Sequence, residues 1–124
     1  MQTFKKVERL KNKKDIINIF NKGNIIQLSP FLLHWRKCEL KKEKNIRILI
    51  TVPKKKVKLA CQRNFLKRRI REAYRKNKHR LYKMVIDKGI CLEIILLYNI
   101  SETITYKLAD EKIKLILDRL SKTL

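Results

Sequence analysis

The sequence predicts one α+β domain, in which helices pack on a small mixed sheet. Stretches with alternating apolar residues, typical of strands, are interspersed with stretches of helical periodicity. A chain of 124 residues can bury one hydrophobic core, and neither a repeat nor a low-complexity linker divides it. We therefore expect a single domain over residues 1–124, with the element order α, β, β, α, β, α.

The N-terminal end combines a basic arm with a short helix. Residues 1–11 carry few apolar side chains, and we expect a partly flexible arm there. Isoleucines and Phe20 recur at helical spacing within 12–21, which predicts the first helix. Gly23 follows as a helix stop.

Two strands should come next. The first covers 24–38, where aromatic residues at alternate positions share one face. Pro30 removes one ladder donor, so this strand lies at an edge or is interrupted there. The second covers 46–52, which alternates in the period-two pattern of a strand with one packed face. Because the charged turn 39–45 joins them, a hairpin is the simplest expectation.

The second half of the chain predicts two helices around a buried strand. A narrow apolar stripe places a long helix over about 58–80, and Gly89 suits a left-handed turn after it. Residues 91–98 are apolar on both faces except for one acid, as in a central strand covered on both sides. The last helix follows a cap at Ser101 or Thr105.

Positive charge is concentrated on the long helix and the loop before it. Lys and Arg outnumber Asp and Glu by 33 to 11, giving a net charge of +22. The range 53–83 holds fourteen basic residues and one acid, Glu72. Like charges recur four residues apart on one flank of the helix and would repel one another without a polyanion. Nucleic acid is therefore the expected partner class, with an anionic membrane surface as the alternative.

Export, membrane insertion and protein-based catalysis are not indicated. The basic N-terminus lacks the apolar segment of a signal peptide, and no stretch reaches the length of a membrane span. Three cysteines without C-x-x-C spacing fit free thiols in a reducing cytoplasm and no metal cluster. No Ser/His/Asp set, Cys/His set or carboxylate pair can be assembled, so we name no catalytic residue and expect a binding role.

One motif is more specific than charge. From Arg63 the sequence reads R-N-F-L-K-R-R-I-R-E, and the lysine pair of V-P-K-K precedes it. The range 8–11 reads E-R-L-K, and a helix followed by glycine comes shortly after. Over nearly the whole chain these features resemble the bacterial ribonuclease P protein component, whose pattern is R-N-R-x-x-K-R-x-x-R-E.

The sequence departs from that family pattern at three places. Phe65 stands where the third residue of R-N-R is an arginine, and it projects away from the basic flank. Ile16 replaces an aromatic residue common in the first helix, which weakens base stacking there. The loop after the lysine pair has no glycine.

The resemblance implies a fold and a function. The fold would be of the ribosomal protein S5 domain 2-like kind, with a left-handed β-α-β crossover against the usual rule. The function would be that of a ribonuclease P subunit, an endoribonuclease that removes the 5′ leader of precursor tRNA. Magnesium ions held mainly by the RNA subunit would do the chemistry. The partners would be that RNA and precursor tRNA, with no obligate protein partner and no membrane.

The resemblance also implies where RNA binds. Contacts to RNA would come from Arg63, Asn64, Lys67, Arg68, Arg71, Lys54, Lys55, Arg9 and Lys11. A cleft between the central helix and the sheet would receive the leader, with Phe20, Phe31 and Trp35 as stacking platforms. For each of these aromatic residues, packing in the core is the alternative.

Two other functions would use the same charge. A structural RNA-binding protein, such as a ribosomal protein or an RNA chaperone, is the main alternative, and the spacing of the motif favours ribonuclease P over it. A nuclease made of protein alone would need clustered acids or a pair of histidines, which the sequence does not offer.

Overall fold

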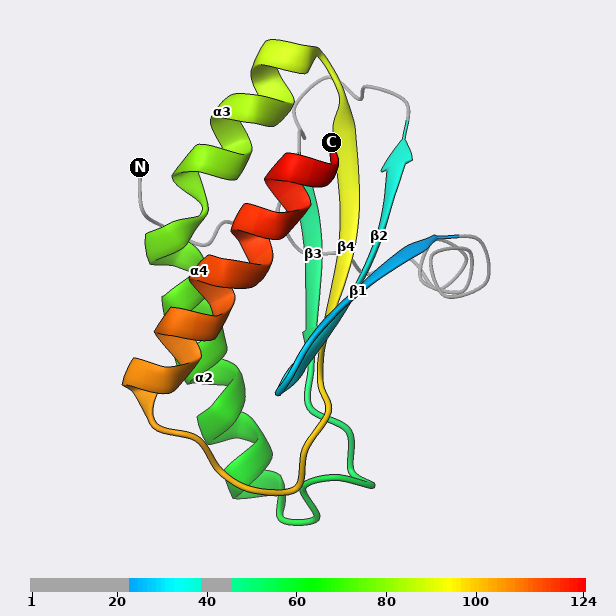
Figure 1. Ribbon diagram of the computed structural model, residues 1–124. Coiled ribbons are helices and arrows are strands. Elements are labelled where there is room, and N and C mark those ends of the chain that lie inside the picture. Colours follow the sequence, from blue (N-terminus) through cyan, green and yellow to red (C-terminus); the bar gives the residue numbers. More distant parts are fainter. Residues whose placement is uncertain (1–22, 39–45) are drawn as a thin grey trace.

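The computed structural model describes residues 23–38 and 46–124 (Figure 1). Its elements are β1 (Asn24–Leu28), β2 (Phe31–Cys38), β3 (Ile46–Thr51), α2 (Ala60–Asn77), α3 (His79–Lys88), β4 (Cys91–Tyr98) and α4 (Tyr106–Thr123). The expected arm 1–11, first helix 12–21 and turn 39–45 lie outside the described residues.

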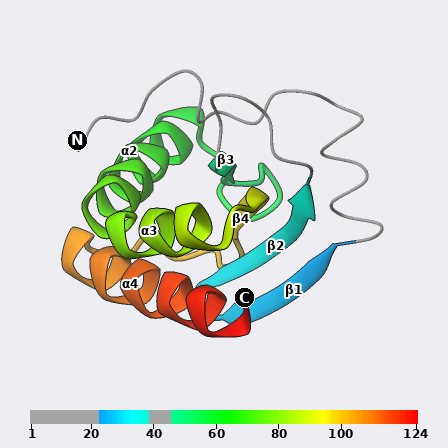
Figure 2. The same cartoon turned by 90° about the horizontal axis from the view of Figure 1, so that it is seen from above.

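The four strands form one mixed sheet in the order β1-β2-β4-β3. β4 runs antiparallel to β2 and parallel to β3, and the crossover from β3 to β4 passes through α2 and α3. The described helices α2, α3 and α4 lie on the same side of the sheet, with α4 beside α2 and α3 (Figures 1 and 2). This two-layer arrangement confirms the predicted α+β class.

The centre of the sheet is β4. Its bounds match the predicted strand 91–98, and all of its residues except Leu97 are buried. The expected hairpin between the two N-terminal strands is wrong, because β2 and β3 each pair with β4 and not with each other. A strand that is apolar on both faces removes most apolar surface from water when it lies between two neighbours.

The predicted strand 24–38 is two strands. A turn at Ser29 and Pro30 separates β1 from β2, which then pair antiparallel, and β1 forms an edge of the sheet. The carbonyl of Pro30 accepts a 2.8 Å hydrogen bond from the backbone N–H of Asn99, just after β4. The interruption predicted at Pro30 is confirmed, and it adds a strand to the expected order.

The predicted helix 58–80 is also divided. Its first part ends at Asn77, and α3 begins at His79. Neither glycine nor proline marks this break. The side chain of Asn77 instead donates to the carbonyl of Ala73 (2.8 Å) and to Asp110 on α4 (2.8 Å), an alternative to continuing the helical ladder.

Two predicted helix signals are confirmed. Gly89 follows α3 in the left-handed conformation, with φ of 63°. Of the two candidate caps for the last helix, Thr105 is the one used, since its hydroxyl accepts a 3.2 Å hydrogen bond from the N–H of Leu108.

The hydrophobic core fills the space between the sheet and the helices. Alternate residues of the strands point toward it, and the apolar stripes of the helices cover them. Its members include Leu33, Ile48, Ile94, Leu96, Leu66, Ile70, Tyr74, Ile113, Ile116 and Leu120. Because Leu66, Ile70 and Tyr74 anchor α2 in this core, the other flank of the helix is turned outward.

The cysteines differ from one another. Cys61 is a free, exposed thiol on α2. Cys91 is buried and disulfide-bonded, and the β2–β4 ladder places Cys38 directly opposite it. Cys91 therefore departs from the free thiol that we expected.

Candidate nucleic-acid interface

The outward flank of α2 carries the residues expected to contact RNA. Leu66, Ile70, Ala73 and Tyr74 anchor the opposite side of the helix in the core. We call the outward set the basic strip; it consists of Arg63, Asn64, Lys67, Arg68 and Arg71. Asn64 and Arg68 are exposed and the other three are half-buried. The fold therefore brings these five expected RNA-contact residues together on one helix.

The loop before α2 is closed and presents lysines. The carbonyl of Pro53 accepts hydrogen bonds from the backbone N–H groups of Lys56 and Val57, both at 3.0 Å. Val57 is buried and fixes the loop to the core. Four side chains of this lysine loop are exposed: Lys54, Lys55, Lys56 and Lys58. Only Lys54 and Lys55 were predicted to contact RNA, although Lys56 and Lys58 belong to the same K-K-K-V-K run.

Arg63 joins the lysine loop to the basic strip. Its Nη1 group donates to the carbonyls of Val57 (3.0 Å) and Lys58 (2.8 Å). A guanidinium has five N–H donors, so Arg63 can hold these carbonyls and still offer donors to a phosphate. Its structural role was not foreseen, because the contact depends on the path of the loop.

The acid of the motif pairs within its own helix. Arg75 donates from Nε to Oε2 of Glu72 at 3.0 Å, and a second bond joins Nη2 to Oε1. This hydrogen bonding lowers the pKa of Glu72 and raises the pKa of Arg75. Glu72 is the one acidic residue in the sequence of α2, and it is engaged with an arginine outside the basic strip.

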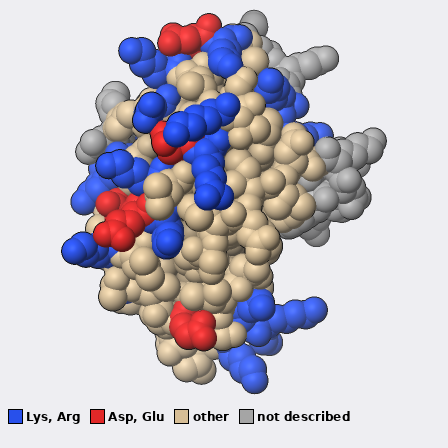
Figure 3. All heavy atoms as spheres, viewed as in Figure 1, with Lys and Arg blue, Asp and Glu red and all other residues tan. Residues whose placement is uncertain are grey.

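The face formed by α3 and α4 has a different charge pattern. Figure 3 shows that acidic side chains lie among the Lys and Arg side chains there. Asp118 pairs with Arg80 on α3 at 2.8 Å and with Lys122 one turn along α4 at 3.6 Å. Mixed charge of this kind is typical of a solvated surface, in contrast to the basic strip.

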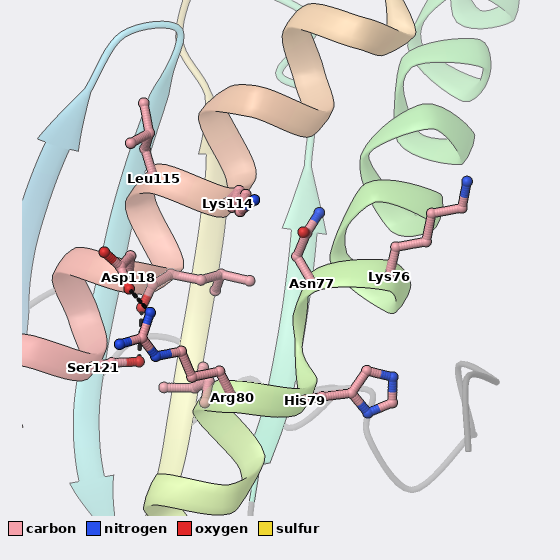
Figure 4. A pocket seen from close by; sticks show the side chains of 10 residues that line it. Lys76, Asn77, His79, Arg80, Lys114, Leu115, Asp118 and Ser121 are labelled. Atoms are coloured by element: carbon pink, nitrogen blue, oxygen red, sulfur yellow. Dashed lines mark hydrogen bonds and ion pairs between the residues drawn. The ribbon is translucent and has the colours of Figure 1, made fainter.

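A hollow of about 350 Å³ lies where α2 gives way to α3, facing α4 (Figure 4). Its lining includes Lys76, Asn77, His79, Arg80, Lys114 and Asp118. Arg80 points across it to Asp118, and the two side chains form an ion pair. The described residues contain no group of three His, Cys, Asp or Glu side chains that could hold a metal ion.

Two of the aromatic residues expected in a leader cleft are buried in the hydrophobic core. Phe31 is 1% exposed and Trp35 is 5% exposed, and both belong to the core beneath the helices. The ring of Phe31 packs edge-on against Tyr98, with 6.0 Å between centroids. Their burial fits the core-packing alternative. Phe20, Arg9 and Lys11 lie outside the described residues.

No helix in the described part of the chain combines the length and apolar character needed to cross a bilayer.

Comparisons with known proteins agree with the motif. The sequence pattern of the family described as Ribonuclease P matches residues 4–121. A ribonuclease P protein component from Thermotoga maritima is 35% identical over 101 residues, which cover 82% of this chain and 79% of that protein. One from Porphyromonas gingivalis is 33% identical over 85 residues, or 68% of this chain. This chain spans only 62% of the length of the latter relative.

The fold comparison points the same way. The solved structure of the ribonuclease P protein from Thermotoga maritima matches with a TM-score of 0.69 and 28% sequence identity. The match covers 90% of this chain and 96% of that protein.

Proposed function

The chain belongs to the ribonuclease P protein family, and from that premise we propose that it assists a catalytic RNA in removing the 5′ leader of precursor tRNA. One observation carries this proposal. The basic strip and the lysine loop expose cations on one continuous stretch of chain, and Arg63 ties the two together. The protein would bind the RNA subunit through this surface.

Binding would be driven mainly by electrostatics. Phosphates that dock on the strip neutralise several fixed cations and release condensed counterions. Arginine suits the task, because its planar fork binds a phosphate bidentately and stacks on a base. Asn64 is exposed between the arginines and can donate to phosphate or sugar oxygens.

The chemistry in this proposal belongs to the RNA subunit. Magnesium ions would be bound mainly there and would activate the attacking water. Among residues 23–38 and 46–124, no group of three His, Cys, Asp or Glu side chains that could hold a metal ion is found. The holoenzyme would thus be an endoribonuclease whose protein subunit binds and positions RNA.

Precursor tRNA would be the second RNA partner, held together with the RNA subunit. We propose no obligate protein partner and no membrane association, and a cytoplasmic location with the RNA partners. The net charge of +22 supports a polyanionic partner for the whole surface.

Reconstituted cleavage tests the proposal. A precursor tRNA with a 5′ leader is incubated at low magnesium with a bacterial ribonuclease P RNA alone, with the protein alone, and with both. We expect cleavage at the mature 5′ end that the protein stimulates, and none with protein alone. Arg68→Glu should reduce the stimulation, whereas Lys83→Glu on α3 should preserve it.

Two results would contradict the proposal. Cleavage by the protein alone would move the chemistry onto the protein. A folded protein that binds the RNA without stimulating it would instead favour a structural RNA-binding protein, the main alternative.

A further inference from the structure

Phe65 is an exposed aromatic residue on the second turn of α2. Its side chain is 47% exposed, while the next residue, Leu66, is completely buried in the core. Core packing therefore does not account for Phe65. Leaving an aromatic side chain this far in water forgoes part of the free energy that its burial would supply.

Arg69 holds the ring in place. Its guanidinium lies over the Phe65 ring, with 4.1 Å between Cζ and the ring centroid. The same guanidinium donates from Nη1 to the carbonyl of Ile104, before α4, at 2.6 Å. Arg69 is thus fixed by the neighbouring segment and covers one face of the ring. The part of the ring that Arg69 does not cover is exposed and can contact a ligand.

We expected Phe65 to project away from the basic flank, but on α2 it lies next to Arg68, at one end of the basic strip. Phe65 precedes Arg68 by three residues, so the two side chains are neighbours on the helix surface. Arg68 is exposed, and so is Cys61 one turn before Phe65. An ordered aromatic ring beside phosphate-binding cations is the arrangement on which unpaired RNA bases stack.

We propose that Phe65 is a stacking platform for an unpaired base of the RNA that docks on the basic strip. The inference rests on the proposed RNA-binding function and deepens it. The base would lie on the face of the ring opposite Arg69, while Arg68 holds the adjoining backbone phosphate. Because stacking involves no counterion, Phe65 would add affinity at every salt concentration.

A fluorescent variant tests the contact directly. Phe65→Trp keeps an aromatic face on α2, and its emission is followed while a bacterial ribonuclease P RNA transcript is added. We expect quenching that saturates with binding. Ile86→Trp on α3, which is 56% exposed, is the matched control and should change little. Trp35 is buried and gives the same background in both variants.

Affinity measurements separate stacking from charge. Phe65→Leu keeps an apolar side chain but removes the ring, and we expect binding of the transcript to weaken about 5- to 100-fold. The slope of log affinity against log salt should stay as in the parent protein. Arg68→Gln should weaken binding and also make that slope less negative by about one.

Three outcomes would overturn the inference. In the first, Phe65→Leu binds the RNA as tightly as the parent, which would make the Phe65–Arg69 pair a surface contact that only supports the helix. In the second, Phe65→Trp binds RNA with unchanged emission. Both leave the proposed function intact. In the third, the folded parent protein does not bind the transcript, and the proposed function fails together with the inference.

Discussion

Arg47 and Glu93 lie directly opposite each other in the parallel ladder of β3 and β4 and form a buried ion pair. On the other side of Glu93, Arg36 of β2 is its partner in the antiparallel ladder and donates from Nε at 2.6 Å. The carboxylate is fully buried, so the two guanidinium groups offset the cost of removing it from water. The three residues occupy the sheet face opposite the helices.

Removing the acid should destabilise the protein strongly. Glu93→Gln leaves two guanidinium groups on either side of an uncharged amide, and we expect the free energy of unfolding to fall by about 3–5 kcal/mol. Urea denaturation measures it. The matched control replaces all three residues, with Arg36→Met, Glu93→Leu and Arg47→Met, and should unfold close to the parent. A loss under about 1 kcal/mol for Glu93→Gln would contradict this account.

Arg63 should order the lysine loop. Arg63→Gln removes both bonds from Nη1 to the loop carbonyls, so the loop should open more often. We expect faster hydrogen exchange at the amides of Lys56 and Val57, which bond to Pro53. The total loss of stability should be about 1 kcal/mol. Arg68→Gln is the control, and equal exchange rates in the two variants would rule out the positioning role.

Binding to ribonuclease P RNA should depend steeply on salt. If the strip and the lysine loop contact about six phosphates, log affinity should fall against log salt with a slope of about −4 to −5. Arg68→Gln should bring this slope about one unit closer to zero. Lys83→Gln, on the mixed-charge side of the molecule, should leave the slope unchanged. A flat salt response in the parent protein would remove the electrostatic basis of the proposal.

His34 should make stability depend on pH. Burial on β2 lowers its pKa, because desolvation disfavours the imidazolium. Below the ordinary pKa of about 6.5, the unfolded chain therefore binds a proton more readily than the folded chain does. The free energy of unfolding consequently decreases as the pH is lowered. The slope contributed by one group is at most about 1.4 kcal/mol per pH unit.

Urea denaturation between pH 5 and 7.5 measures this effect. His34→Gln should flatten the fall in stability toward low pH, and His79→Gln, which changes an exposed residue of α3, should retain it. If the His34 variant keeps the full pH dependence of the parent, another group is responsible.

The sequence predicted best those elements whose pattern depends on burial alone. The β4 strand was found with its bounds because it is apolar on both faces. Strand pairing could not be read in the same way. Adjacency in sequence suggested a β2–β3 hairpin, while the sheet places β4 between them.

In the candidate site as well, residues grouped by helical spacing were predicted, whereas contacts that depend on strand pairing were not. Helical spacing was enough to gather the basic strip on one flank of α2. Period-two spacing placed Phe31 and Trp35 on one strand face but gave no information on which face the helices cover. Glu93 was visible as a single acid in an apolar strand, yet its two arginine partners come from strands whose register only the fold defines.

The outward flank of α2 is expected to lie against RNA. Cys61, a free and exposed thiol in the described part of the chain, is two residues before Arg63 and can carry an iron–EDTA group. The measurement maps hydroxyl-radical cuts in a bound bacterial ribonuclease P RNA. For comparison the group is moved to α4 in a variant with Cys61→Ser and Leu115→Cys, where the side chain is 51% exposed.

We expect discrete cuts in the RNA from position 61 and few from position 115, with both conjugates bound to the RNA. Strong cuts from position 115 and none from position 61 would place the RNA on the α3–α4 face and contradict the account.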